Sequence, residues 1–227
     1  MKPSPDELTG LTDRHIITGV TDRFEARREV IEAFQRMHQA AKKENIDIGV
    51  VSGFRSFQKQ LHIWNQKFSG RRPVLDHHNQ DVDISKCTAT QLVDLILIWS
   101  AIPGGSRHHW GTDLDVIDRT VIPKGYEVRL IDSEYTVSGL FHRLNQWLTA
   151  HASEYGFYAP YTGLNLNMYA EPWHISYFPL ATGYLQDLTP SLLKNSLEQS
   201  DILGKEEVLE KIEEIFNTKI KNVAAPP

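Results

Sequence analysis

The sequence predicts an α+β fold, with a small, mostly antiparallel sheet flanked by helices and a helical C-terminal tail. Segments with helical periodicity and short β-branched runs are interspersed, and no regular βαβ repeat is present. The chain of 227 residues is long enough to bury a sizeable core. Its content of 41% hydrophobic and 23% charged residues is typical of a soluble globular protein.

The first half of the chain predicts two helices and one strand. Residues up to about 22 carry no clear pattern. From Arg23 to Asn45 apolar residues recur at three- and four-residue steps with charges between them, which indicates an amphipathic helix. The β-branched run at 46–52 predicts a buried strand, and a second helix is expected at 57–68. Residues 69–86, rich in Asp and His, predict a loop.

The second half predicts two helices, two strands and a helical tail. A helix is expected from Thr88 to about Ser100, capped by Thr88 or Thr90 and stopped by the Pro-Gly-Gly at 103–105. The remaining expected elements follow in order: a strand at 111–117 with Leu114 and Val116 on one face and Asp113 and Asp115 on the other, a helix at 137–155, a strand at 171–178, and a tail from about 189 to 222 that is helical and broken at Gly204. We expect a domain at 1–185 and a helical extension at 186–227, packed on or beside it.

Composition and charge exclude several partners. The net charge of −5 and the pI near 6.1 argue against a nucleic-acid partner. No apolar run approaches the roughly 20 residues that span a bilayer, so no membrane partner is expected. The first residues lack an apolar signal region, and the single Cys87 suits a reducing compartment. A cytoplasmic location is therefore expected; a protein from which a leader had been removed would be periplasmic instead.

Three clusters of polar residues could carry chemistry. They lie at 52–57 with Gln60, at 106–115 and at 171–177. Each has an ordinary explanation alone, as a hydrogen-bonded histidine, a solvated strand face or a chance Glu-x-x-His pair. Together they offer two imidazoles and a carboxylate, which fill three positions of a tetrahedral zinc site and leave the fourth open to water. A nearby Glu can accept a proton and an Arg can stabilise an oxyanion, so the combination predicts a metallopeptidase.

These motifs resemble a known family. The string Ser-x-His-x-x-Gly-x-x-x-Asp at 106–115, with Glu-x-Trp-His at 171–174 and Ser-Gly-Phe-Arg-Ser at 52–56, is similar to the LAS-type zinc peptidases. These include the D-alanyl-D-alanine and LD-carboxypeptidases of the VanY group, which are related to D-Ala-D-Ala dipeptidases and to the hedgehog fold. The motifs occur in the family's order and cover roughly residues 25–180.

The resemblance implies a role for each matched residue. It implies one Zn²⁺ per chain, bound by His108, Asp115 and His174, with Glu171 as the catalytic base. It further implies that Arg55 contacts the substrate and the charge that develops on the scissile carbonyl oxygen. Two more matched residues, Gln60 and Ser106, would face the C-terminal carboxylate of the substrate. The expected partners are peptidoglycan stem peptides or muropeptides.

Some residues depart from the family pattern or stay open. The family often has a small residue where this chain has Asp113, which faces the same side as Asp115 and could orient a ligand or compete for zinc. Phe54 stands where the family usually has Tyr. His109 is expected to support the site or the fold. The segment 76–83 is a polar loop or a cleft rim that selects the substrate, and the C-terminal tail packs on the domain or forms a partner surface.

The motifs are common to enzymes of two specificities. DD-carboxypeptidases remove the last D-Ala of a pentapeptide, and LD-carboxypeptidases remove D-Ala from a tetrapeptide. A cytoplasmic enzyme favours the LD reaction of cell-wall recycling, since pentapeptide precursors must stay intact there. A non-catalytic hedgehog-like zinc module and a phage-type endolysin peptidase are the alternatives. The sequence does not indicate the oligomeric state.

Overall fold

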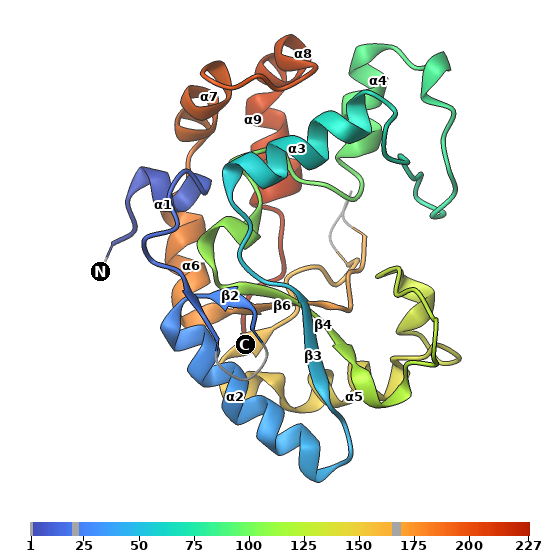
Figure 1. Cartoon of the computed structure of the whole chain (residues 1–227). Helices are drawn as coiled ribbons and strands as arrows, with labels where there is room; N and C mark the ends of the chain where they lie inside the picture. The colour runs from blue at the N-terminus through green and yellow to red at the C-terminus, as the bar shows by residue number, and fades with distance from the viewer. Residues whose placement is uncertain (1, 20–22, 165–168) are drawn as a thin grey trace.

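A four-stranded antiparallel sheet forms the centre of the protein. The computed structural model describes residues 2–19, 23–164 and 169–227 (Figure 1). The strand order is β3-β4-β6-β5, and β1 and β2 pair separately. The strands span these residues: β1 Ile17–Thr18, β2 Glu25–Ala26, β3 Ile48–Ser52, β4 Asp113–Asp118, β5 Phe157–Tyr158 and β6 His174–Tyr177. The small antiparallel sheet flanked by helices confirms the predicted fold class.

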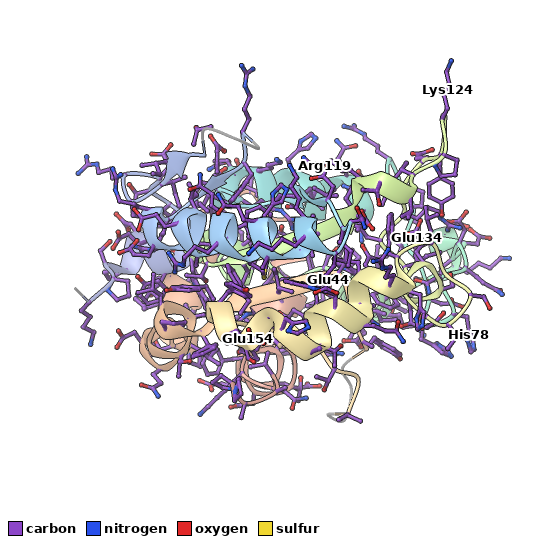
Figure 2. All side chains as sticks on the ribbon, turned by 90° about the horizontal axis from the view of Figure 1, so that it is seen from below. Glu44, His78, Arg119, Lys124, Glu134 and Glu154 are labelled. Atoms are coloured by element: carbon purple, nitrogen blue, oxygen red, sulfur yellow. The ribbon has the colours of Figure 1, made fainter. Side chains whose placement is uncertain are left out.

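One hydrophobic cluster joins the sheet to helices α2 (Arg28–Lys43) and α5 (His142–His151). Leu114 and Val116 of β4 are fully buried in it, as the alternation in the sequence predicts. Glu44 lies at the end of α2 (Figure 2). Its carboxylate accepts a hydrogen bond of 2.8 Å from the indole of Trp147 on α5. This cluster therefore fixes the sheet face opposite to Asp113 and Asp115.

A second hydrophobic cluster joins α3 to the C-terminal helices. Its helices span these residues: α3 Phe57–Phe68, α4 Ala89–Ile96, α6 Phe178–Asp187, α7 Pro190–Glu198, α8 Lys205–Glu210 and α9 Ile212–Ile215. Trp64 of α3 is fully buried, and its indole donates a 2.9 Å hydrogen bond to the Leu203 carbonyl. The tail thus packs on α3 and α4. The predicted boundary at 185/186 falls inside α6, and the division into two units stays a prediction.

Several element boundaries differ from the sequence expectation. Helix α1 (Pro5–Thr9) lies in the segment expected to be irregular, because Ser4 and Glu7 form a capping box and Pro5 suits the first turn. Helix α4 starts after Thr88, which caps it, and ends earlier than expected. The helix expected from residue 137 begins only at His142. There the chain packs so closely that a Cβ on Gly139 would lie 2.4 Å from the Glu134 backbone.

Short turns complete the element order. Single 3₁₀ turns lie at Ile84–Lys86, Arg107–Trp110, Arg119–Val121, Asp132–Glu134 and Ala152–Tyr155, and a π-helical turn at Phe216–Ile220 closes the tail. Helix α6, which the sequence analysis missed, follows β6 directly with Pro179 in its first turn. Within the described ranges no helix has both the length and the apolar character needed to cross a membrane.

Candidate active site

The register of the sheet brings residues from three strands side by side. Asp115 on β4 pairs with His174 on β6 and, across the other edge, with Ser52 on β3. A register irregularity between Val50 and Ser52 bends the end of β3 at this point. Strand pairing alone therefore places the second and third predicted metal ligands next to each other.

The other imidazole, that of His108, comes from the 3₁₀ turn at Arg107–Trp110. Gly111 ends this turn at φ +67°, and a Cβ there would lie 2.4 Å from the Ile16 side chain, so only glycine fits. The Nδ1 atom of His108 lies 2.9 Å from the Gly53 carbonyl oxygen. Because a carbonyl only accepts, Nδ1 carries the proton and Nε2 keeps a free lone pair that faces Asp115.

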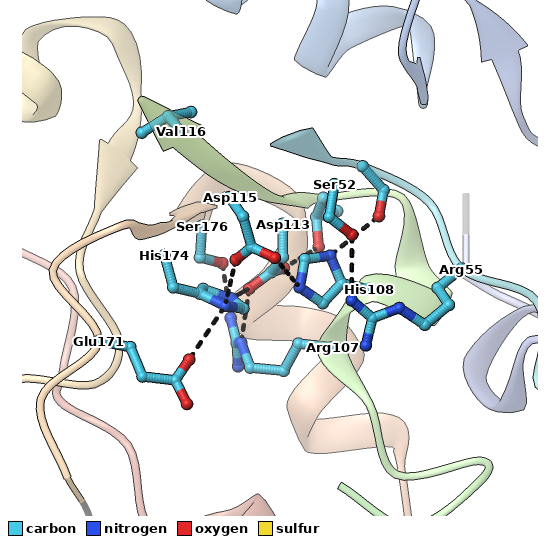
Figure 3. A network of polar contacts seen from close by, with 12 residues as sticks. Ser52, Arg55, Arg107, His108, Asp113, Asp115, Val116, Glu171, His174 and Ser176 are labelled. Atoms are coloured by element: carbon cyan, nitrogen blue, oxygen red, sulfur yellow. Dashed lines mark hydrogen bonds and ion pairs between the residues drawn. The ribbon is translucent and has the colours of Figure 1, made fainter. Parts of the chain in front are cut away.

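The three predicted ligands form one cluster whose ligand atoms lie within 4.8 Å of one another (Figure 3). His108 Nε2 is 3.4 Å from Asp115 Oδ2, and His174 Nδ1 is 3.3 Å from Asp115 Oδ1. Zinc bonds of about 2.0–2.2 Å at tetrahedral angles place ligand atoms about 3.3–3.6 Å apart. In addition, the buried Asp115 Oδ1 has no hydrogen-bond partner. The donor set and its spacing fit Zn²⁺.

Asp113 lies behind the cluster and orients His174. Its Oδ1 accepts hydrogen bonds from His174 Nε2 at 2.9 Å and from Arg107 Nε at 2.8 Å. Its Oδ2 accepts from the Thr112 hydroxyl at 2.6 Å. Arg107 also donates to Ser176 Oγ at 2.6 Å. With Nε2 protonated toward Asp113, His174 presents Nδ1 as its metal-binding atom. Of the two roles considered for Asp113, the contacts match that of orienting a ligand.

The electrostatics of this cluster favour a bound cation. Burial alone would raise the pKa of Asp115, but the neighbouring imidazoles of His108 and His174 lower it well below its usual range. Burial would lower the pKa of His174, yet its hydrogen bond to Asp113 and the nearby carboxylates of Asp115 and Glu171 raise it well above the usual value. The negative field that holds a proton on His174 would equally stabilise a divalent cation at the same place.

Glu171 stands beside the cluster on the cleft side. A backbone hydrogen bond from the His174 N–H to the Glu171 carbonyl, 2.9 Å long, closes the turn between them. The Glu171 Oε2 atom is 3.5 Å from His174 Nδ1. The side chain is 21% exposed, whereas that of Asp115 is 8% exposed. Glu171 can therefore reach a water molecule in the cleft next to the metal ligands, as a general base must.

Arg55 and Gln60 form a hydrogen-bonded pair at the start of α3. The Arg55 guanidinium donates to Gln60 Oε1 at 2.9 Å and to Ser52 Oγ at 3.0 Å. The Gln60 amide nitrogen donates to the Ala101 carbonyl at 2.7 Å. Gln60 is almost fully buried, and its polar atoms are used within the fold. The geometry thus shows Gln60 holding Arg55, which differs from the expected contact with a substrate carboxylate.

Ser106 and His109 have different surroundings. Ser106 is buried at the cleft wall, and within the described part of the chain its hydroxyl has no hydrogen-bond partner. His109 is fully buried; its Nδ1 donates to the Arg55 carbonyl at 2.5 Å and its Nε2 accepts from the Gly104 N–H at 3.0 Å. Burial lowers the pKa of His109 to about 3, so it is neutral. It supports the Arg55 backbone and lies outside the metal cluster.

The cluster opens into a cavity of about 660 Å³. Leu75, Asn79 and Asp81 line it, so part of the loop at 76–83 does border the cleft. The His and Asp residues of that loop do not gather into a metal site: among the described residues, the trio of His108, Asp115 and His174 is the one group found with metal-binding geometry.

Two lining residues were given no role from the sequence. Arg107 is buried next to Asp113, and its guanidinium lies 4.7 Å from the Trp110 ring centroid. Because arginine is seldom buried, the hydrophobic pattern of the sequence gave no indication that Arg107 lies inside the fold. The Tyr161 ring packs edge-on against His174 at 4.9 Å and comes from a segment with no motif. Both residues restrict the position of the His174 ring.

The chain is similar in sequence to known proteins. The family model described as "VanY: D-alanyl-D-alanine carboxypeptidase" matches residues 23–180. An uncharacterized protein of Haemophilus influenzae is 35% identical over 121 residues, which cover 52% of this chain and 92% of the relative. The putative carboxypeptidase YodJ of Bacillus subtilis is 29% identical over 156 residues, which cover 66% of this chain and 45% of YodJ.

Two solved structures share the fold. VanYB in complex with D-alanine-D-alanine aligns with a TM-score of 0.53 at 19% identity, covering 82% of this chain and 89% of VanYB. The LdcB LD-carboxypeptidase aligns with a TM-score of 0.50 at 22% identity, covering 89% of this chain and 81% of LdcB. At these identities the likeness concerns the fold, which is the same for a protein bound to D-Ala-D-Ala and for an LD-carboxypeptidase.

Proposed function

This chain belongs to the VanY D-alanyl-D-alanine carboxypeptidase family, and from that premise we propose that it is a zinc-dependent LD-carboxypeptidase. It would remove the C-terminal D-alanine from peptidoglycan tetrapeptide stems. The observation that carries the proposal is the buried trio of His108, Asp115 and His174 with Glu171 beside it at the cleft. The place of Glu171 favours an enzyme over a non-catalytic zinc module.

Each residue has a defined task in the proposed reaction. Zn²⁺, when bound, would polarise the scissile carbonyl and lower the pKa of a water molecule toward neutrality. Glu171 would accept the proton of the attacking water and return it to the leaving amine. The Arg55 guanidinium, held by Gln60 and Ser52, would stabilise the negative charge that develops on the carbonyl oxygen.

The proposed preference for tetrapeptides rests on a proposed location of the enzyme in the cytoplasm. Tetrapeptides recovered there must lose D-Ala before the tripeptide is reused, whereas pentapeptide precursors must remain intact. The second candidate is a DD-carboxypeptidase, which the likeness to VanYB in complex with D-Ala-D-Ala supports. The residues of the metal cluster serve either reaction equally, so the substrate has to be tested directly.

The deciding experiment is mass spectrometry of the products formed by the zinc-loaded protein. Soluble tetrapeptide and pentapeptide muropeptides are incubated separately, with and without EDTA. We expect tetrapeptide to become tripeptide, pentapeptide to stay unchanged, and EDTA to stop the reaction. Loss of one D-Ala from pentapeptide alone would assign the DD reaction. No EDTA-sensitive cleavage of either peptide would overturn the proposed enzyme activity.

A further inference from the structure

Helix α3 presents a lysine, Lys67, to the cleft. Ile63 and Lys67 lie one turn apart on α3, and both line the cavity. The Lys67 ammonium donates a 2.7 Å hydrogen bond to the Ser100 hydroxyl. Within residues 2–19, 23–164 and 169–227 it forms no ion pair with a carboxylate. Lysines are seldom placed in a partly enclosed cleft without an anion.

Other positive groups stand on the same wall. Arg72, which follows α3, lines the cavity and has no ion pair with any described carboxylate. Arg55, which also lines the cavity, donates hydrogen bonds to the uncharged side chains of Ser52 and Gln60. Burial, together with the charges of Arg72 and Arg55, lowers the pKa of Lys67 to about 8. Three cations therefore oppose one another here, and an anion that entered the cleft would relieve that repulsion.

The acidic residues of the cleft leave this wall positive. Asp115 belongs to the metal cluster, and Glu171 stands beside it. Asp81 and Glu127 also line the cavity, but neither forms an ion pair with the cations. Gln60, which was expected to face the substrate carboxylate, uses both ends of its amide within the fold. The described cleft thus offers donors for an anion on the α3 wall.

From these contacts we propose that Lys67 and Arg72 form an anion subsite that binds a carboxylate of the peptide substrate. The inference rests on the proposed function and adds a specificity determinant to it. Stem peptides carry this group at the C-terminus and, in glutamate and diaminopimelate residues, along the stem. A carboxylate of either origin would sit between the two cations and form charge-assisted hydrogen bonds. If the group lies on diaminopimelate, stems with lysine at that position bind more weakly.

The test compares three variants on helix α3. Lys67→Met removes the charge at similar length, Lys67→Arg retains it, and Lys59→Met is the matched control because Lys59 is exposed and does not line this cleft. A hydrogen bond to a charged group corresponds to a roughly 10- to 100-fold change in binding. We expect Lys67→Met to raise KM by that factor with little change in kcat, Lys67→Arg to recover most of it, and Lys59→Met to match the wild type.

Three substrates identify the carboxylate: the diaminopimelate tetrapeptide, its lysine counterpart, and the tetrapeptide with the glutamate carboxylate amidated. If Lys67→Met leaves the KM of one peptide unchanged, the carboxylate missing from that peptide is the group that the subsite binds. An equal increase in KM for all three peptides assigns the C-terminal carboxylate. Unchanged KM for Lys67→Met on every peptide would overturn the subsite while leaving the proposed reaction in place.

Calorimetry separates the subsite from the proposed activity. Glu171→Gln, alone and combined with Lys67→Met, is titrated with the same peptides, so that binding is measured without turnover. Weaker binding by the double variant supports the subsite even if the wild type cleaves none of the peptides. Equal affinity of the two proteins would overturn it.

Discussion

Replacing Asp113 by Asn tests whether the buried carboxylate orients a metal ligand. The Asn side chain retains the shape of Asp, and its oxygen can still accept from His174 and Arg107. Its negative charge is lost, so Arg107, which is almost fully buried, becomes an uncompensated cation. Removing one partner of a buried ion pair costs about 3–5 kcal/mol of stability. Loss of the carboxylate behind a ligating histidine lowers metal affinity by roughly 10- to 100-fold.

The double variant Arg107→Met/Asp113→Asn separates the two effects. Both charges are then absent, so most of the lost stability should return. The zinc affinity should remain low, because His174 still lacks its carboxylate partner. Stability is measured by urea unfolding in EDTA, and zinc affinity by competition with a chromophoric chelator. Wild-type zinc affinity in the single Asn variant would refute the orienting role, whatever its stability.

Three further predictions concern the base, a surface ion pair and the tail. Glu171→Gln should lower kcat by about 10²- to 10⁴-fold and leave zinc affinity close to that of the wild type; kinetics and the chelator assay measure both, and an active variant would exclude Glu171 as the base. The pKa of Asp47 is lowered to about 2, chiefly by a hydrogen bond from Arg119. Because the pKa is lower in the folded state, the ionised Asp47 stabilises the fold at pH values above its unfolded pKa near 3.8. This stabilisation is lost as the pH falls through about 2. Because Asp47 is 29% exposed, Asp47→Asn should cost under about 1 kcal/mol in urea unfolding at pH 7 and nothing at pH 1.5; an equal cost at both would contradict this. Trp64→Ala should cost about 3–5 kcal/mol in the same assay, since Trp64 fills the cluster shared with the tail; a cost below 1 kcal/mol would mean that the tail is not part of the core.

The type and order of most elements could be predicted because their signals are local. The apolar steps along α2 and the alternation of β4 arise from residues a few positions apart, and the structure confirms both. The helix expected from Arg23 begins only at Arg28, because Glu25–Ala26 pair with β1 as strand β2. The misplaced boundaries arose where distant packing decided the conformation. Gly139, for example, packs against the Glu134 backbone, and the helix starts only after this turn. No periodicity within the helix itself could indicate that delay.

In the candidate site, too, short motifs indicated some residues, whereas the role of others depends on contacts made by folding. The family resemblance of three short motifs implied roles for His108, Asp115, His174 and Glu171, and the fold brings these four side chains together. The resemblance implied a substrate contact for Gln60, whereas in the structure its amide binds Arg55 and the Ala101 carbonyl, a partner far along the chain. The role of a polar side chain depends on which donors and acceptors surround it, and those come from other elements.

The sequence by itself determined the fold class, the family resemblance and the residues able to bind zinc. Tertiary structure alone decided which nitrogen of each imidazole faces the metal position, because the protons are placed by the Gly53 carbonyl and the Asp113 carboxylate. It also decided that Lys67, on the cleft wall, forms no ion pair with any carboxylate in the described part of the chain. Protonation and charge balance depend on burial and on partners brought together only by folding, and no local pattern records them.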